Sequence, residues 1–138
     1  MDKYRATEAE LYKYRQRVAR VRVLQMELSD ILEESPLRGF SSGDGGSSGK
    51  IGDPVGDFVA NQNDRAEKKR KQIEKEEKPL VKMEKAFSVL NHAEEEIIIF
   101  RYFKGYGWKE LAERCGYSVS HAKKLRRDGV EKISEVLW

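Results

Sequence analysis

Apolar side chains recur at alternating steps of three and four residues through the N-terminal segment, residues 1–35. Their seam comprises Leu11, Tyr14, Val18, Val21, Gln25, Leu28 and Leu32, of which only Gln25 is fully polar. This heptad pattern is typical of a long helix that packs along one side against another helix. Thr7 and Glu10 have the spacing of a capping box, and Pro36 disfavours helix in the residue before it. We therefore expect one long helix over residues 7–34.

Residues 36–56 follow this helix and contain seven glycines, four serines and two prolines. Such a composition cannot bury apolar surface, so we interpret the stretch as a flexible loop. Helical spacing resumes over residues 57–90, with a seam of Val59, Ala66, Ile73, Leu80, Met83, Phe87 and Leu90. We expect Pro79 to kink or break this charged helix near Lys78, because proline lacks a backbone donor. Two long helices joined by a flexible loop predict an antiparallel hairpin.

The last segment, residues 91–138, contains start and stop signals for three short helices. Asn91 and Glu94 can cap the first helix, which should end near Gly105. A second helix is expected over residues 108–115, and Ser118 can cap the third. The residues spaced to face inward are Ile97, Ile98, Phe100, Leu111, Ala112, Cys115, Ala122, Leu125, Val130 and Ile133. The sequence thus predicts an all-α fold, a long antiparallel helical hairpin followed by a C-terminal helix-turn-helix three-helix unit that turns at Gly116-Tyr117-Ser118.

Positive charge gathers on the third of these helices. Residues 119–127 carry four cations and no carboxylate, although the net charge of the chain is only +3. The side chains expected along one face are Ser120, Lys123, Lys124 and Arg127. Long cationic donors on one helix fit the DNA major groove, which admits a helix and presents guanine acceptors and phosphates. The alternative is a solvated helix face with no ligand.

No catalytic or metal-binding pattern accompanies the basic helix. The chain has one cysteine, which excludes an internal disulfide, and two histidines far apart, which predict no metal site. The Gly/Ser stretch lacks the residue order of a phosphate-binding loop. The longest apolar run, residues 97–100, is too short to cross a membrane. We therefore expect a protein of the reducing cytoplasm that is not an enzyme, needs no cofactor and has no membrane partner.

Several motifs in the C-terminal half carry a family resemblance. They are Glu94-x-x-Ile97-Ile98-x-Phe100-Arg101-Tyr102, Gly105-x-x-Trp108-x-Glu110-Leu111-Ala112, and Gly116-Tyr117-Ser118 followed by the basic helix. Residues 90–137 resemble region 4 of bacterial sigma factors, the domain that reads the minus-35 promoter element. The preceding long helix, Ser/Gly-rich loop and Asp53-Pro54-Val55-Gly56-Asp57 extend this into a resemblance to phage and prophage regulators, the ArpU- and RinA-like late-gene regulators.

This resemblance implies roles for single residues. The residues that face bases would be Ser120, Lys123 and Lys124, and Arg127 joins them because it shares the same helix face. The set close to the DNA backbone would be Trp108, Lys109, His121 and Arg126. The core of the helix-turn-helix would comprise Ile98, Leu111, Ala112, Cys115, Ala122 and Leu125. For Trp108, packing beneath the third helix remains an equal alternative to contact with the DNA backbone.

The resemblance also implies a function in a bacterial host cell. It implies a sequence-specific DNA-binding transcriptional regulator, an activator of phage or prophage late genes, which binds double-stranded promoter DNA and acts with bacterial RNA polymerase. The long helices would pair two copies into a homodimer or contact the polymerase. Two alternatives stay open. One is a phage small terminase-like DNA-packaging subunit, and the other is an RNA polymerase-binding module without specific DNA binding.

Overall fold

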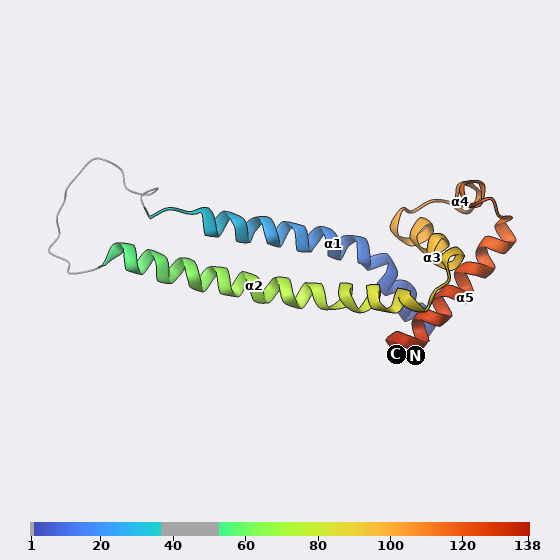
Figure 1. Ribbon diagram of the computed structural model, residues 1–138, viewed down its shortest axis with the longest axis horizontal. Helices are drawn as coiled ribbons and strands as arrows, with labels where there is room; N and C mark the ends of the chain where they lie inside the picture. The colour runs from blue at the N-terminus through green and yellow to red at the C-terminus, as the bar shows by residue number, and fades with distance from the viewer. Residues whose placement is uncertain (1, 37–52) are drawn as a thin grey trace. The chain divides into compact units, whose positions relative to one another are not determined.

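The computed structural model of this chain describes residues 2–36 and 53–138 (Figure 1). Its helices are α1 (Lys3–Glu33), α2 (Pro54–Ala86), α3 (His92–Ile98), α4 (Trp108–Cys115) and α5 (Val119–Leu137). A short 3-10 turn, Phe87–Val89, precedes α3, and a π-helical turn, Ile99–Phe103, follows it. No strand occurs in these two ranges, which confirms the expected all-α fold. Most of the loop predicted for residues 36–56 lies outside the described residues.

The chain divides into two compact units, each of which contains parts of both long helices. The first unit joins Met1–Arg20 to Glu76–Trp138, and the second is Val21–Lys75. The unit that contains the helix-turn-helix is therefore larger than residues 91–138. It includes the beginning of α1 and the end of α2.

An apolar core holds the first unit together across α1, α2, α3 and α5. Its buried members are Leu11, Met83, Ala86, Ile98, Tyr102, Val130 and Ile133. Beside this core, the buried Thr7 hydroxyl donates to the carbonyl of Lys3 at 2.8 Å and accepts from the indole N–H of Trp138 at 3.0 Å. The start of α1 and the end of α5 are thereby joined, as Figure 1 shows.

Two of the predicted helix features were wrong. α1 begins at Lys3, so Thr7 lies inside the helix and its hydroxyl packs in the core instead of capping an end. Of the kink or break expected at Pro79, the break does not occur, because α2 continues to Ala86. Proline inside a helix costs roughly 3 kcal/mol. The neighbouring Leu80 and Met83 are buried, and their tertiary packing offsets that cost.

In the second unit, α1 and α2 run antiparallel. The Gln62 amide donates to the carbonyl of Ile31 at 2.7 Å, whereas Lys69, farther along α2, lies 2.6 Å from the carboxylate of Glu27. The long hairpin predicted from the two heptad seams is thus present. The buried residues differ in part from the predicted seam. Leu24 is buried in place of Gln25, and the predicted seam residues Leu32 and Val59 are exposed. A straight helix drifts away from a strict seven-residue repeat, which explains the shift.

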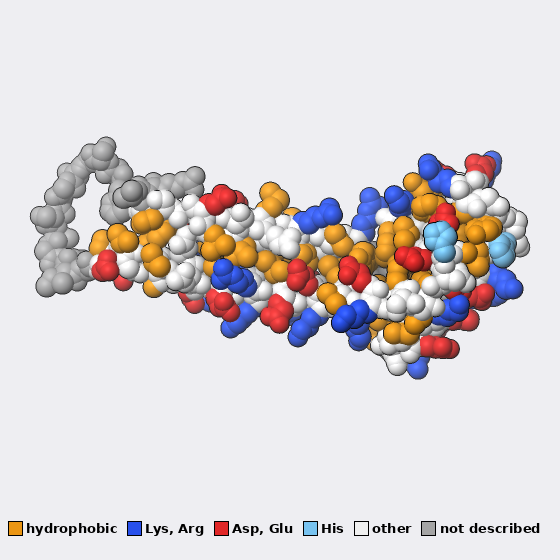
Figure 2. Space-filling model, in the orientation of Figure 1, with side chains coloured by type: hydrophobic (Ala, Val, Ile, Leu, Met, Phe, Trp, Pro, Cys, Tyr) orange, Lys and Arg blue, Asp and Glu red, His pale blue; other side chains and the backbone are white. Residues whose placement is uncertain are grey.

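The charged part of α2 in this unit carries both signs. Arg65 pairs with Glu34, and Lys68 lies 3.3 Å from Asp64. On the face drawn in Figure 2, basic and acidic side chains are interspersed along the helix, so this stretch is no uniformly basic surface. Within residues 2–36 and 53–138, no helix combines the length and the apolar character needed to span a membrane.

Candidate nucleic-acid interface

A tight turn connects α4 to α5 and fixes the direction in which α5 leaves α4. α4 ends at Gly116, whose φ of 76° and ψ of 22° lie in the left-handed region that glycine adopts without strain. The N–H groups of Gly116 and Tyr117 donate to the carbonyl of Ala112 at 2.9 and 3.1 Å. Ser118 accepts a hydrogen bond from the N–H of His121 at 3.1 Å and caps α5. The helix-turn-helix turn predicted here is confirmed.

A second apolar cluster packs α3, α4 and α5 together at this turn. Its fully buried members are Ile97, Leu111 and Ala122, with Cys115 and Leu125 among the side chains packed against them. Ala112 is also buried. Ile98, expected in this helix-turn-helix core, belongs instead to the core that contains Leu11. Consecutive helical residues point about 100° apart, so the neighbours Ile97 and Ile98 serve two different clusters.

The first half of α5 presents an exposed basic face. Its exposed members are Ser120, Lys123, Lys124 and Arg127, which are the residues predicted to face DNA bases. Together with the half-buried Arg126 they line a shallow groove that has no carboxylate among its lining residues. The structure therefore brings the four predicted side chains onto one surface of α5.

Trp108 packs against the flank of α5. Three cationic groups lie over its ring: the guanidinium carbons of Arg101 and Arg126 at 4.7 and 5.1 Å from the ring centroid, and Nζ of Lys123 at 5.7 Å. Cation–π contacts of this kind contribute about 0.5–1 kcal/mol each at exposed sites. Of the two interpretations that the sequence left open, the structure shows the packed ring, and this packing helps to orient Lys123.

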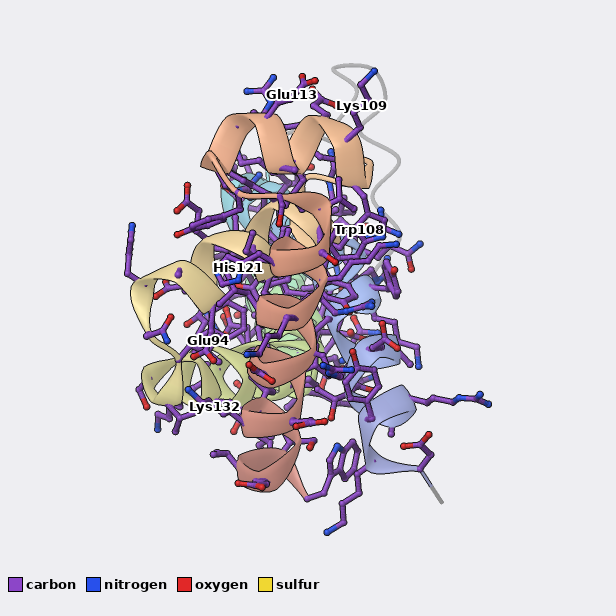
Figure 3. All side chains as sticks on the ribbon, turned by 90° about the vertical axis from the view of Figure 1, so that its right-hand side faces the viewer. Glu94, Trp108, Lys109, Glu113, His121 and Lys132 are labelled. Carbon is purple, nitrogen blue, oxygen red and sulfur yellow. The ribbon has the colours of Figure 1, made fainter. Side chains whose placement is uncertain are left out.

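The other two residues expected near the DNA backbone, Lys109 and His121, are exposed. Lys109 lies in the first turn of α4, and Figure 3 shows it at the outer edge of that helix together with Glu113. The His121 ring packs edge-on against Tyr117, with centroids 5.1 Å apart. In Figure 3 His121 and Trp108 lie on opposite sides of α5, so they flank the helix.

Arg126 differs from its neighbours because it already has partners inside the first unit. The Tyr102 hydroxyl donates to the Glu8 carboxylate at 2.7 Å, and Nη1 of Arg126 donates to the same oxygen at 3.4 Å. Burial, and after it this hydrogen bond to Glu8, raises the pKa of Tyr102. Sequence reasoning missed the link because no local pattern relates residues that lie 118 positions apart.

Glu94 anchors α3 to the middle of α5. Its carboxylate accepts from the N–H of Asn91 at 3.0 Å, and the Asn91 side chain accepts from the N–H of Glu94 at 2.9 Å, which is the predicted capping box. The same carboxylate is buried and accepts from Lys132 at 2.8 Å. Figure 3 labels both residues. Gly129 allows α5 to lie close to α3, because a Cβ at this position would lie 2.6 Å from Cδ1 of Ile98.

A compact unit of three helices whose third helix is basic and exposed is a helix-turn-helix of the type that binds DNA. Residues 86–135 match the family model for sigma-70, region 4. This segment is therefore similar to sigma-70 region 4, and the similarity suggests a DNA-binding function related to transcription. No curated protein and no solved structure gave a match to the chain.

Proposed function

We propose that this protein is a sequence-specific DNA-binding regulator of transcription that reads a promoter through α5. The observation that carries the proposal is the exposed groove of Ser120, Lys123, Lys124 and Arg127 on α5, within the segment that matches sigma-70 region 4. The groove lies along one helix face and presents only cationic or hydroxyl donors. DNA bases and phosphates are the ligands that accept from such a set.

In this proposal the exposed side chains of α5 read base edges. Lys123, Lys124 and Arg127 donate to the O6 and N7 acceptors of guanines, and Ser120 adapts to either donors or acceptors. On one side of α5, a phosphate binds Lys109 and the N-terminus of α4, which begins at Trp108. Free N–H groups at a helix start attract anions. His121 meets the backbone on the other side.

We assign Arg126 a structural role in place of the phosphate contact expected from the sequence. Its guanidinium lies over Trp108 and donates to Glu8, and the side chain is only 24% exposed. Both contacts hold the guanidinium within the first unit. It therefore supports the groove by holding α5 against the start of α1.

The proposed consequence of DNA binding is activation of phage or prophage late genes in the cytoplasm of a bacterial host. Region 4 of a sigma factor acts within an RNA polymerase holoenzyme, which supports recruitment of host RNA polymerase as the mechanism. The protein would hold the polymerase at promoters that α5 selects.

The long helices would join two copies into a homodimer. Support comes from α1 within the second unit, where Val23 is 45% and Met26 68% exposed, because exposed apolar side chains on one helix favour association. Sedimentation of the full chain across a concentration series tests this, and a dimer is expected. A monomer at all concentrations would remove the dimer from the proposal, and a large closed ring would point to a DNA-packaging subunit.

The decisive experiment selects a duplex from a randomised pool with the wild-type protein and then measures binding of Lys124→Ala. Removal of a base-reading donor should reduce discrimination between the selected and a scrambled duplex by roughly 10- to 100-fold. Lys85→Ala is the matched control, because it removes the same charge from an exposed position on α2 of the same unit. Unchanged discrimination in Lys124→Ala, or no enriched sequence for the wild type, would overturn the proposal.

A further inference from the structure

α1 carries a second concentration of positive charge that the proposed function does not use. Residues 11–26 contain five cations and no carboxylate. They are Lys13, Arg15, Arg17, Arg20 and Arg22. This is one cation more than residues 119–127 carry in the DNA-reading helix. A concentration of one sign creates a local potential that attracts anionic ligands.

The protein itself supplies a counter-charge on one side of α1. Glu10 pairs with Arg17 and lies 4.0 Å from Lys13, so the face that bears Lys13 and Arg17 is neutralised in part. Arg15 points to a different side, because residues two positions apart on a helix are separated by about 200°. It is exposed and has no ion pair within the part of the chain that the structure describes.

The face of α1 that bears Arg15 is the one that meets the helix-turn-helix unit. Glu8, Tyr12 and Arg15 follow one another at steps of four and three residues and therefore share a face. Glu8 contacts Tyr102 and Arg126, and the Tyr12 ring packs edge-on against Tyr102 with centroids 4.8 Å apart. Arg15 thus continues, one turn beyond Tyr12, a surface that begins at the groove of α5.

We propose that this face of α1 is a second DNA-binding surface, on which Arg15 contacts the phosphate backbone beyond the base pairs read by α5. The inference rests on the proposed DNA-binding function and extends its footprint. Arg15 lies seven residues, or about 10 Å of helix, beyond Glu8. Duplex DNA carries one charge per roughly 1.7 Å of its axis, so phosphates are available at this distance. The Tyr12 side chain is 51% exposed, and its hydroxyl is a further donor to a phosphate.

The experiment compares Arg15→Ala with Arg20→Ala in the full-length chain. Both positions are exposed on α1, and both variants lose one positive charge, so long-range electrostatics change equally. They differ in the face of the helix, since five residues correspond to about 140° of rotation. Affinity for a long mixed-sequence duplex is measured across a salt series, which requires no specific site. Circular dichroism and thermal unfolding verify that both variants fold.

If Arg15 binds a phosphate, Arg15→Ala should lower the slope of log affinity against log salt by about one and weaken binding several-fold at low salt. Arg20→Ala should match the wild type in slope. On the selected duplex, Arg15→Ala should lose affinity only when the flanking base pairs are present. Equal slopes for the two variants would overturn the inference, because net charge alone would then explain the binding.

The outcome for α1 can be separated from the outcome for the proposed function. If Lys124→Ala loses discrimination while Arg15→Ala and Arg20→Ala behave alike, α5 reads DNA and the α1 surface does not bind it. If Arg15→Ala alone lowers the salt slope but no sequence is enriched by the wild type, the α1 surface binds DNA and the specific regulator is refuted.

Discussion

Leu11 offers a direct test of whether the start of α1 belongs to the helix-turn-helix unit. It lies far upstream of the segment that matches sigma-70 region 4, yet it shares a core with Ile98 of α3 and Val130 of α5. All three side chains are 0% exposed. Leu11→Ala should therefore destabilise the unit that carries the DNA-reading helix, although α1 is not part of the matched domain.

The magnitude follows from the enclosure of the side chain. Leucine-to-alanine changes in closed cores cost roughly 2–5 kcal/mol, because the lost burial adds to the cavity that remains. Leu11 is surrounded by side chains from three other helices, which limits collapse of the site, so we expect about 3 kcal/mol. Such a loss changes the ratio of folded to unfolded molecules by about 100-fold. It is a large share of the roughly 5–15 kcal/mol that stabilises a domain.

Urea unfolding followed by tryptophan fluorescence measures this loss, since Trp108 and Trp138 both lie in the first unit. We expect the midpoint of Leu11→Ala to fall by roughly 1–2 M urea. Leu111→Ala, at a residue 0% exposed in the other cluster, should cost a similar amount. Leu32→Ala, at a residue 49% exposed on the same helix, should cost under about 0.5 kcal/mol. If Leu11→Ala unfolded at the same urea concentration as Leu32→Ala, the assignment of α1 to this core would be refuted.

Three further predictions concern titratable and charged groups of the same unit. Glu94→Gln keeps an oxygen for the N–H of Asn91 but loses the charge that faces Lys132, so it should cost about 1 kcal/mol, against about 2 kcal/mol for Glu94→Ala. Equal losses in urea unfolding would contradict a contribution from the capping hydrogen bond, and no loss in Glu94→Gln would contradict one from the ion pair. Burial and the hydrogen bond to a carboxylate raise the pKa of Tyr102, so the stability it contributes is complete below the ordinary phenol pKa of about 10 and declines as the pH rises above it. Tyr102→Phe should therefore show a smaller loss of unfolding free energy on going from about pH 9 to pH 11 than the wild type, and an equal loss would argue against this assignment. Burial also raises the pKa of the Cys115 thiol, and alkylation by iodoacetamide at about pH 8 should be at least about tenfold slower in the folded protein than in urea; equal rates would mean that the thiol is accessible.

Local sequence signals were sufficient to predict the helix-turn-helix. The capping box at Asn91 and Glu94, the C-terminal glycine at Gly116 and the N-cap at Ser118 each act within a few residues. Because the backbone groups at a helix end are satisfied by neighbours in the sequence, such boundaries can be read without knowledge of the fold. The exposed basic face of α5 followed from the same reading, because helical periodicity determines which side chains share a side.

Signals that depend on packing were less reliable. The displacement of the seam from Gln25 to Leu24 could not be foreseen, because both positions fit a repeat of three and four residues and only the partner helix decides between them. Pro79 was expected to interrupt a helix on local grounds, yet α2 continues through it with Leu80 and Met83 buried. In both cases tertiary contacts outweigh a local preference of a few kcal/mol.

Local sequence signals are enough to specify the all-α class, the turn between α4 and α5, and the basic face of α5. The tertiary structure alone decided that Leu11 and Glu8 belong to the unit around that turn, that Ile97 and Ile98 serve different cores, and that Arg126 is held by Glu8 beside Tyr102. The physical reason is the range of the interactions. A cap or a helical face is encoded within one or two turns, whereas a core contact depends on how distant segments of the chain pack to exclude water.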